Sequence, residues 1–269
     1  MLEVKNLTCG YGNKIVLKNI SFKTNRSAIL GVIGPNGSGK TTLLRGITRA
    51  IKLNDGEVFL ESENIKNMDH REFARKTAVV SQSTAAVQMT VEEFVLLGRI
   101  PHFKNFQFLE TARDREIVHK YMKLTDICGF KDRSISELSG GEKQLAVITR
   151  ALCQEPGLLL MDEPIAHLDV AHQVTVLDLI NRLNKELMLT VIIVLHDLNM
   201  ASEYCHELLL LDKGKIFKKG QPWEVLTYQN IEKVYDTTVV VEKHPFSSKP
   251  HVLIVSEEAK KMNFKKRSE

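Results

Sequence analysis

The feature of this sequence that most constrains the fold is a glycine-rich run between an apolar segment and a helical pattern. Ala28 to Ile33 is apolar enough for a buried strand, and a helical pattern begins at Leu43. The glycines let successive backbone N–H groups turn toward one anion, at which the next helix also points its positive N-terminus. We therefore predict a nucleotide phosphate cradle, in which Lys40 reaches the β- and γ-phosphates and Thr41 is a hydroxyl ligand for Mg²⁺. The run consists of Gly34, Pro35, Asn36, Gly37, Ser38, Gly39, Lys40, Thr41 and Thr42.

A second apolar run ends in two adjacent carboxylates. Leu158 to Met161 leads directly into Asp162 and Glu163. Open α/β sheets bind ligands at the carboxyl ends of their strands, so both side chains are expected at the ligand-binding edge. Adjacent buried carboxylates are costly without a cation. We therefore assign Asp162 to the Mg²⁺ shell and Glu163 to polarising an attacking water, which predicts hydrolysis.

Another Ser/Gly-rich segment, Ser139, Gly140 and Gly141, precedes the helical pattern from Lys143 to Cys153. Free backbone donors at a helix start bind anions, but Ser and Gly are also good capping residues. Taken alone, the segment is therefore equally compatible with a helix cap and with a second anion site.

The apolar runs predict an α/β fold. Four short runs separated by helical patterns indicate a parallel sheet covered on both faces: Ala28 to Ile33, Thr77 to Val80, Leu158 to Met161 and Thr190 to Leu195. Earlier runs are interrupted by turn residues, as antiparallel hairpins are, and predict a small β layer beside the nucleotide site. Those runs are Leu2 to Leu7, Val16 to Phe22 and Glu57 to Leu60, with interruptions at Gly10, Gly12, Asn54, Asp55 and Gly56.

The domain organisation follows from the same patterns. From about Val91 to Cys153 the sequence is mostly helical, and the core strands resume only at Leu158. We predict one cassette over residues 1–236, with a helical subdomain inserted at about 87–157, and a short C-terminal extension at 237–269. A hairpin is expected at Asp212 to Lys215, and the extension has strand-like runs at Val239 to Val241 and Val252 to Val255.

Composition excludes several classes of protein. The 269 residues are 43% apolar, yet no apolar run approaches the about 18 to 20 residues of a membrane span. The N-terminus lacks the apolar core of a signal peptide, so we expect the cytosol. Four dispersed cysteines without a Cys-x-x-Cys pair argue against a zinc site and a disulfide framework. A net charge of +4 does not by itself indicate nucleic acid, and the basic residues between Lys260 and Arg267 are expected to form a solvated tail.

Together these elements resemble the ATP-binding-cassette (ABC) ATPases, in which Leu138 to Glu142 matches the signature sequence. The resemblance implies a P-loop NTPase (RecA-like) core that binds ATP and Mg²⁺. It also implies that Tyr11 stacks on adenine, that Gln82 is the Q-loop residue that senses the γ-phosphate and ligates Mg²⁺, and that His196 is the switch histidine at the γ-phosphate.

In that family the signature of one subunit closes over the nucleotide of the other, which implies an ATP-dependent head-to-tail homodimer. Ser139, Gly140 and Gly141, with Asp169 of the D-loop, are then nucleotide-binding residues. The sequence has Glu142 where glutamine is usual, and Ala166 and His167 where serine and alanine are common. Neither departure affects the phosphate or Mg²⁺ groups, so we expect an active ATPase.

Several segments resemble the ATPase subunits of importers for iron-siderophore, haem and cobalamin. This implies a peripheral protein on the cytoplasmic face of the cell membrane, coupled to two permease subunits and indirectly to a substrate-binding protein. Residues Gln82 to Phe103 are expected to form the permease groove, and molybdate or tungstate uptake remains open. The segments are Thr90 to Phe94, Gly98 to His102, His167 to Gln173, His196 to Ala201 and Leu210 to Gly214.

Other functions were weighed against this one. A soluble ABC ATPase acting on nucleic acid or ribosomes usually has two cassettes or a long coiled coil, whereas this chain has one cassette and no sustained heptads. A small-molecule kinase has no need of Leu138 to Gly141, and an exporter half is usually fused to membrane helices. We therefore expect no nucleic-acid partner.

Overall fold

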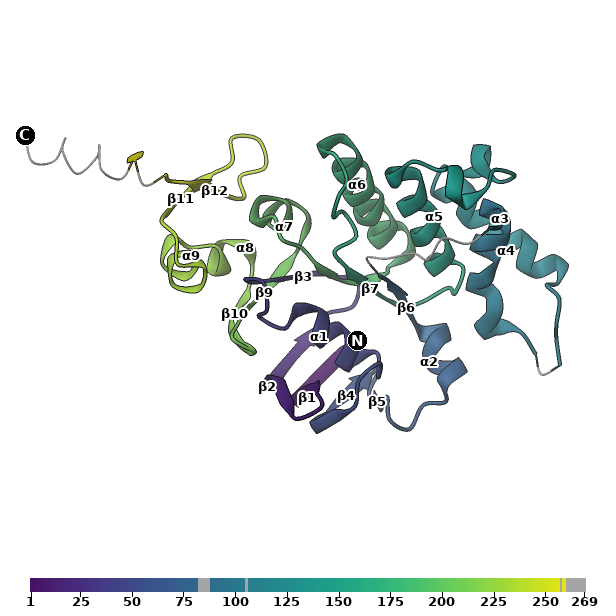
Figure 1. The fold of residues 1–269 in the computed structure, drawn as a ribbon, viewed down its shortest axis with the longest axis horizontal. Helices are drawn as coiled ribbons and strands as arrows, with labels where there is room; N and C mark the ends of the chain where they lie inside the picture. Colours follow the sequence, from purple (N-terminus) through teal and green to yellow (C-terminus); the bar gives the residue numbers. More distant parts are fainter. Residues whose placement is uncertain (82–87, 105, 257, 260–269) are drawn as a thin grey trace, which may run out of the picture.

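The computed structural model describes residues 1–81, 88–104, 106–256 and 258–259. At its centre lies a six-stranded sheet in the order β10-β9-β3-β8-β7-β6 (Figure 1). The pairs among β9, β3, β8, β7 and β6 are parallel, and β10 is antiparallel to β9, as the hairpin at Asp212 predicts. The strands are β3 (Ile29–Ile33), β6 (Thr77–Val80), β7 (Leu158–Asp162), β8 (Thr190–Val194), β9 (Glu207–Asp212) and β10 (Lys215–Gly220).

Apolar side chains point to alternate faces along these strands, which explains why both faces of the sheet are covered. In β3, Ile29 and Ile33 belong to one buried cluster, and Leu30 and Val32 belong to the other. Side chains alternate between faces along a strand, so each strand is apolar on both sides. One face packs against α1 (Lys40–Ile47), and the other against α5 (Gly140–Leu152) and α6 (Val170–Leu187). The predicted α/β class is confirmed.

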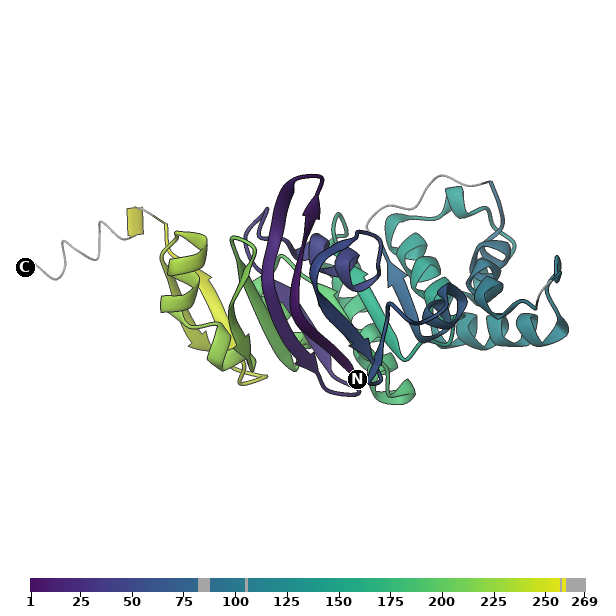
Figure 2. The same cartoon turned by 90° about the horizontal axis from the view of Figure 1, so that it is seen from below.

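A four-stranded sheet in the order β2-β1-β4-β5 covers the α1 side (Figure 2). The expected antiparallel layer is therefore present, but its expected interruptions are mostly wrong. β1 runs through Gly10, and β4 runs through Asn54, Asp55 and Gly56; shifts in register at these places let the pairing continue. The strands are β1 (Leu2–Tyr11), β2 (Lys14–Thr24), β4 (Leu53–Leu60) and β5 (Glu63–Asn64).

The described residues between β6 and β7 are mostly helical, as predicted. Thr90, Thr111 and Ser139 each close a capping box, which fixes the starts of α3, α4 and α5. The boundaries 87–157 for a separate subdomain stay a prediction. An additional short helix, α2 (His70–Lys76), buries only Phe73 and had no clear sequence pattern. The elements of the segment are α3 (Val91–Leu96), η1 (Leu97–His102), α4 (Ala112–Leu124), η2 (Cys128–Phe130), η3 (Ile135–Glu137) and α5.

Apart from β9 and β10, the described chain after β8 forms small elements, of which α8, α9, β11 and β12 lie at the end of the molecule opposite α4 (Figure 1). The small elements are α7 (Leu198–Tyr204), α8 (Pro222–Val225), α9 (Tyr228–Tyr235) and the antiparallel pair β11 (Val239–Lys243) and β12 (Pro250–Ile254). All four cysteines are free thiols, and Cys128 is partly exposed rather than buried. Across the described part of the chain, no helix has both the length and the apolarity needed to span a bilayer. The basic tail from Lys260 onward lies outside the described residues.

Candidate functional site

The glycine-rich loop joins β3 to α1 in a conformation that needs its glycines. Gly34, Gly37 and Gly39 have φ values of +146°, +78° and +105°, which side chains rarely tolerate. A Cβ at Gly34 would also overlap the carbonyl oxygen of Leu211, whereas a Cβ at Gly37 would meet nothing within 4 Å. The loop is therefore tight against the sheet at its start and open at its centre, and α1 begins at Lys40, earlier than the predicted Leu43.

A cleft of about 200 Å³ opens at this loop. The Ser38 hydroxyl is buried and has no hydrogen-bond partner within the described residues, which fits a loop built to surround an anion. Glu163 comes from the end of β7, so the cleft joins two segments distant in sequence. Its lining consists of Val16, Asn36, Gly37, Gly39, Lys40, Thr41, Thr42 and Glu163.

Lys40 is the cation of the cleft. Its side chain is 5% exposed, and Nζ donates to the carbonyl oxygens of Gly34 at 2.8 Å and Pro35 at 3.1 Å. Burial lowers the pKa of Lys40, while the charges of Glu163 and Asp162 act in the opposite direction. The two bonds use two of three N–H donors of an ammonium group. A lysine held in this way fits a phosphate oxygen as its next partner.

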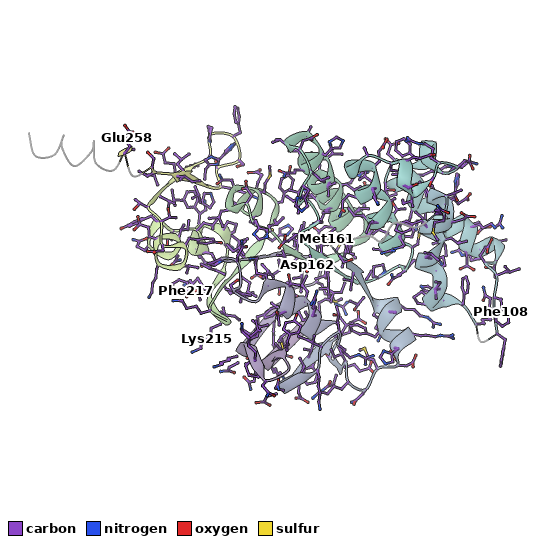
Figure 3. All side chains as sticks on the ribbon, viewed as in Figure 1. Phe108, Met161, Asp162, Lys215, Phe217 and Glu258 are labelled. Carbon is purple, nitrogen blue, oxygen red and sulfur yellow. The ribbon has the colours of Figure 1, made fainter. Side chains whose placement is uncertain are left out.

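Thr41 and Asp162 bring two hard oxygen donors together, and Asp162 lies at the centre of the molecule (Figure 3). The Thr41 hydroxyl donates to Asp162 Oδ1 at 3.1 Å. Burial raises the pKa of Asp162, as does the charge of Glu163, whereas the Thr41 hydrogen bond lowers it. A nearby cation would relieve the cost of this buried carboxylate. A hydroxyl and a carboxylate are ligands that Mg²⁺ accepts, so the residues present fit the ion.

Glu163 and His196 form a pair that neither motif shows by itself. β7 and β8 are neighbours with Asp162 opposite Val194, so the residues that follow these strands lie at one edge of the sheet. His196 Nε2 is 2.5 Å from Glu163 Oε1. Because the carboxylate accepts, this contact assigns a proton to Nε2 of the imidazole. The predicted water-activating carboxylate and the predicted switch histidine therefore act on each other directly.

Tyr11 lies at the end of β1 and outside the phosphate cleft. It lines a separate hollow of about 500 Å³ with residues of β4, and its ring is 43% exposed. Arg45 of α1 donates to the phenol oxygen at 3.1 Å, and its guanidinium carbon is 6.0 Å from the ring centroid. The ring is thus held beside the helix that starts at Lys40, with room for a base. Sequence reasoning had missed Arg45, which no motif contains.

The signature residues begin α5 and do not line the phosphate cleft of their own chain. Ser139 caps the helix by accepting from the Glu142 N–H at 3.3 Å, and Glu142 Oε2 accepts from the Ser139 N–H at 2.8 Å. This backbone bond is the main reason that the pKa of Glu142 is lowered. Ser139 and Gly140 are exposed. The cap interpretation is therefore correct for the single chain, while an anion site at this exposed helix start stays a prediction.

Asp169 starts α6 next to the same segment. It accepts from the His172 backbone N–H at 2.9 Å, and Nδ1 of the His172 ring lies 2.8 Å from Asp169 Oδ1. A Cβ at Gly141 would overlap the His172 ring. The D-loop and the signature are therefore in contact through this histidine, which the sequence motifs did not indicate.

The structure thus brings together the residues of the glycine-rich loop, Asp162, Glu163 and His196, and places Tyr11 in an adjoining hollow. It does not bring Ser139, Gly141 or Asp169 into the same cleft. Gln82 lies outside the described residues. The roles of all these side chains remain predictions, which the geometry supports to different extents.

Comparisons with known proteins agree with this geometry. The family model described as ABC transporter matches residues 17–166. The ferric enterobactin transport ATP-binding protein FepC of Escherichia coli (strain K12) is 38% identical over 253 residues, which cover 94% of this chain and 93% of that protein. The uncharacterized ABC transporter ATP-binding protein YvrA of Bacillus subtilis (strain 168) is 38% identical over 257 residues, but this chain spans only 58% of its length.

Among solved structures, one described as a metal-chelate type ABC transporter in an inward-facing conformation superimposes with a TM-score of 0.84 at 26% identity. The match covers 96% of this chain and 98% of that one. The family model covers more than half of the 269 residues, and the match to FepC is nearly end to end. This chain therefore belongs to the ABC transporter family, as an ATP-binding subunit.

Proposed function

We propose that this chain hydrolyses ATP to drive a membrane importer for iron chelated by a siderophore, from the cytoplasmic face of the cell membrane. The observation that carries the hydrolytic part is the convergence of Lys40, Thr41, Asp162, Glu163 and His196 at one edge of the sheet. Lys40 and Thr41 begin α1, Asp162 and Glu163 lie at the end of β7, and His196 follows β8. The fold, and not the chain order, therefore brings them together.

Each residue has a chemical role in this proposal. Backbone N–H groups of the loop and Lys40 Nζ bind the phosphates, and the third ammonium proton is donated to a phosphate oxygen. Glu163 orients a water for attack on the γ-phosphate and accepts its proton. His196 holds Glu163 through the 2.5 Å contact and contacts the γ-phosphate. Gln82 is assigned to the same end of the site from the family resemblance alone.

Thr41 and Asp162 would hold Mg²⁺, and Gln82 is assigned as a further ligand from the family resemblance alone. When bound, the ion neutralises charge on the phosphates and orients them. Thr41 and Asp162 are positioned for this by their own hydrogen bond at 3.1 Å, which ties the first turn of α1 to the end of β7. Removing Mg²⁺ with a chelator should therefore abolish hydrolysis.

A second copy of the chain completes the site. Ser139 and Gly140 are exposed at the start of α5, which packs on the sheet face opposite to α1. They lie outside the cleft of their own chain, so they are free to close on the nucleotide of a partner. ATP then links the two chains head to tail, and hydrolysis removes the link.

Two permease subunits receive this motion at the surface formed by α3 and η1. Leu97 and Ile100 are exposed apolar residues on η1. The segment is held firmly, because Arg99 is 4% exposed and donates to Asp114 Oδ1 at 3.0 Å and to the Cys153 carbonyl oxygen at 2.6 Å. An exposed apolar patch on a rigid support is typical of a protein interface.

The cargo is inferred from relatives. FepC is named for ferric enterobactin transport, and a solved structure that matches 96% of this chain is described as a metal-chelate type transporter. In such systems a substrate-binding protein and the permease contact the cargo, so haem, cobalamin and oxoanions are the alternatives to test. No observation favours a soluble cassette acting on nucleic acid or ribosomes.

The test is uptake by cells that carry this chain with a permease and a substrate-binding protein whose genes lie in its own genome. Radioactive iron is supplied as a ferric siderophore, and haem, cobalamin and molybdate are supplied in parallel. We expect accumulation of the ferric siderophore with the unmodified chain and with Glu186→Gln on the exposed side of α6 as control, but not with Glu163→Gln. Uptake of only another cargo would correct the proposed substrate, and uptake by Glu163→Gln at the full rate would contradict the hydrolytic role.

A further inference from the structure

The C-terminal extension is fastened to α7, the helix that starts two residues after His196. The Asn199 side chain donates from Nδ2 to the Val252 carbonyl oxygen at 3.1 Å and accepts at Oδ1 from the Val252 N–H at 2.7 Å. One turn further on, the Ser202 hydroxyl donates to the Pro250 carbonyl oxygen at 2.6 Å. The Lys249 ammonium donates to the Glu203 carbonyl oxygen. The outer side of α7 is thus bonded along its length to β12.

α7 depends on such contacts for its position. With seven residues it is too short to be a stable helix by itself. Ser202 is 2% exposed, so its bond to Pro250 is shielded from water, where losing one partner is costly, and the bonds of Asn199 to Val252 are partly buried. The amide of Asn199 pairs with both backbone groups of Val252, as a neighbouring strand would. This arrangement fixes α7 in both translation and rotation.

The start of α7 connects the position of this helix to Glu163 and His196, which we call the hydrolytic pair. Asp197 caps the helix by accepting from the N–H groups of Asn199 at 2.7 Å and Met200 at 2.9 Å. His196 is the residue before this cap, and its Nε2 lies 2.5 Å from Glu163 Oε1. A series of hydrogen bonds therefore joins Val252 to Asn199 and Asn199 to Asp197, and Asp197 is the neighbour of His196 in the chain.

Tyr235, at the end of α9, lies near the phosphate loop, just before the extension begins. Burial raises the pKa of its phenol to about 12, while a hydrogen bond from the Gly34 backbone acts in the opposite direction. Gly34 is the first residue of the phosphate loop. A cavity of about 280 Å³ lies between α7, α9 and the strands of the extension, with His196 and Asn199 in its lining. This cavity is lined by His196, Asp197, Leu198, Asn199, Ile231, Tyr235, Thr237, Val239, Val252 and Ile254.

We propose that the C-terminal extension positions His196 for ATP hydrolysis and that Asn199 is the positioning residue through which it acts. The inference rests on the proposed role of Glu163 and His196. Asn199 has no contact with the phosphate loop or Lys40 among the described residues, so its loss disturbs the hydrolytic pair and spares ATP binding. The expected signature is a lower kcat with nearly unchanged KM for ATP.

Asn199→Ala in the full chain tests this, with Asn230→Ala as the matched control. Asn230 also donates from its amide to backbone carbonyls, those of Glu224 at 3.4 Å and Val225 at 3.0 Å, but it joins α9 to α8. We expect Asn199→Ala to lower kcat about tenfold, since small misplacements of catalytic groups have effects of this order, and to change KM less than about twofold. Asn230→Ala is expected to keep kcat.

A double-mutant cycle separates positioning from general destabilisation. If Asn199 acts through His196, then adding Asn199→Ala to His196→Ala should lower the residual kcat by less than about twofold. If the two effects multiply, the inference is overturned. Should Asn199→Ala fail to fold in a thermal unfolding experiment, Ser202→Ala replaces it in the same cycle, because it removes only the bond to Pro250.

Hydrogen exchange provides a readout that is independent of activity. Backbone amides of residues 196–204 should exchange faster in Asn199→Ala than in Asn230→Ala or the unmodified chain, and equal rates would overturn the inference. If the unmodified chain hydrolyses no ATP, the proposed function is contradicted and exchange alone decides the matter. If it does hydrolyse ATP and Asn199→Ala does so equally well, only the positioning role is overturned.

Discussion

At the scale of single residues, Glu163 has an unusual backbone conformation. Its φ is +52°, which is unfavourable for a residue with a side chain and costs on the order of 1 to 2 kcal/mol. Asp162, the residue before it, pairs with Thr41, whereas Glu163 pairs with His196. Asp162 and Glu163, although consecutive, thus contact different partners.

Glu163→Gln should keep ATP binding and lose turnover. The amide preserves the shape of the side chain but cannot accept a proton from water, so hydrolysis should fall by about 10² to 10⁴-fold. An ATP-bound dimer should then accumulate, which size-exclusion chromatography with and without ATP would detect. Glu186→Gln, at an exposed position of α6, controls for the charge change. Turnover at the unmodified rate would remove Glu163 from its assigned role.

Tyr11→Ala should weaken ATP binding by about 1 to 3 kcal/mol if the ring stacks on the base, taking the energy of base stacking as a guide. Tyr11→Phe is the matched control, because it keeps the ring and removes only the hydroxyl that accepts from Arg45 at 3.1 Å. Calorimetric titration with ATP measures both variants. Equal affinities for all three chains would show that Tyr11 is merely a hairpin aromatic.

At the scale of elements, α5 and α6 meet at a contact that only glycine permits. Gly141 lies in the first turn of α5 against the His172 ring of α6, while a Cβ at Gly140 would make an ordinary contact of 3.5 Å with Leu168. His172 in turn is bound to Asp169. The contact joins the signature helix to the D-loop, so we expect the two motifs to move as one unit.

Gly141→Ala should therefore destabilise the chain by about 1 to 3 kcal/mol, the usual cost of overpacking. Gly140→Ala should be neutral or slightly stabilising, since alanine is the better helix former. Denaturant unfolding measures both, and His172→Ala combined with Gly141→Ala should restore much of the loss by making room. Equal stability of the two single variants would mean that His172 moves aside without cost.

At the scale of the whole molecule, the two halves of the proposed nucleotide site lie on opposite faces of the central sheet. The phosphate loop and α1 are on the face of the antiparallel layer, and α5 is on the other (Figure 1). A single chain cannot fold its own Ser139 onto its own Lys40 without breaking this core. A composite site therefore requires two copies related head to tail.

Mixing a Lys40→Ala chain with a Ser139→Arg chain tests the composite site. Each homodimer should be inactive, but in the mixed dimer one site combines the intact Lys40 of one chain with the intact Ser139 of the other. We expect ATP-induced closure to recover, with up to one working site per mixed dimer. Because hydrolysis can require both sites, crosslinking of the Ser139 region to the phosphate of bound nucleotide should be scored as well. Crosslinks confined to single chains would contradict the head-to-tail model.

The features predicted correctly are those that depend on neighbours along the chain. The phosphate loop, the strand ending in Asp162 and Glu163, and the cap at Ser139 are contiguous, so backbone rules over a few residues suffice. The same rules failed at Asn54, Asp55 and Gly56, where pairing with β1 overcomes weak strand propensity. The bounds of the helical subdomain and the roles of the site residues remain predictions.

Contacts between side chains distant in sequence could not be predicted and follow from the packing of the fold. Glu163 contacts His196 because β7 and β8 are neighbours in the sheet, and Arg45 meets Tyr11 because β1 lies over α1. Asn199 pairs with Val252 because β12 returns to α7. None of these pairs has a signal in chain order, since strand order and layer packing are set by burial of apolar surface across the whole molecule. The local sequence thus indicates which side chains are reactive, and the fold determines which residues they contact.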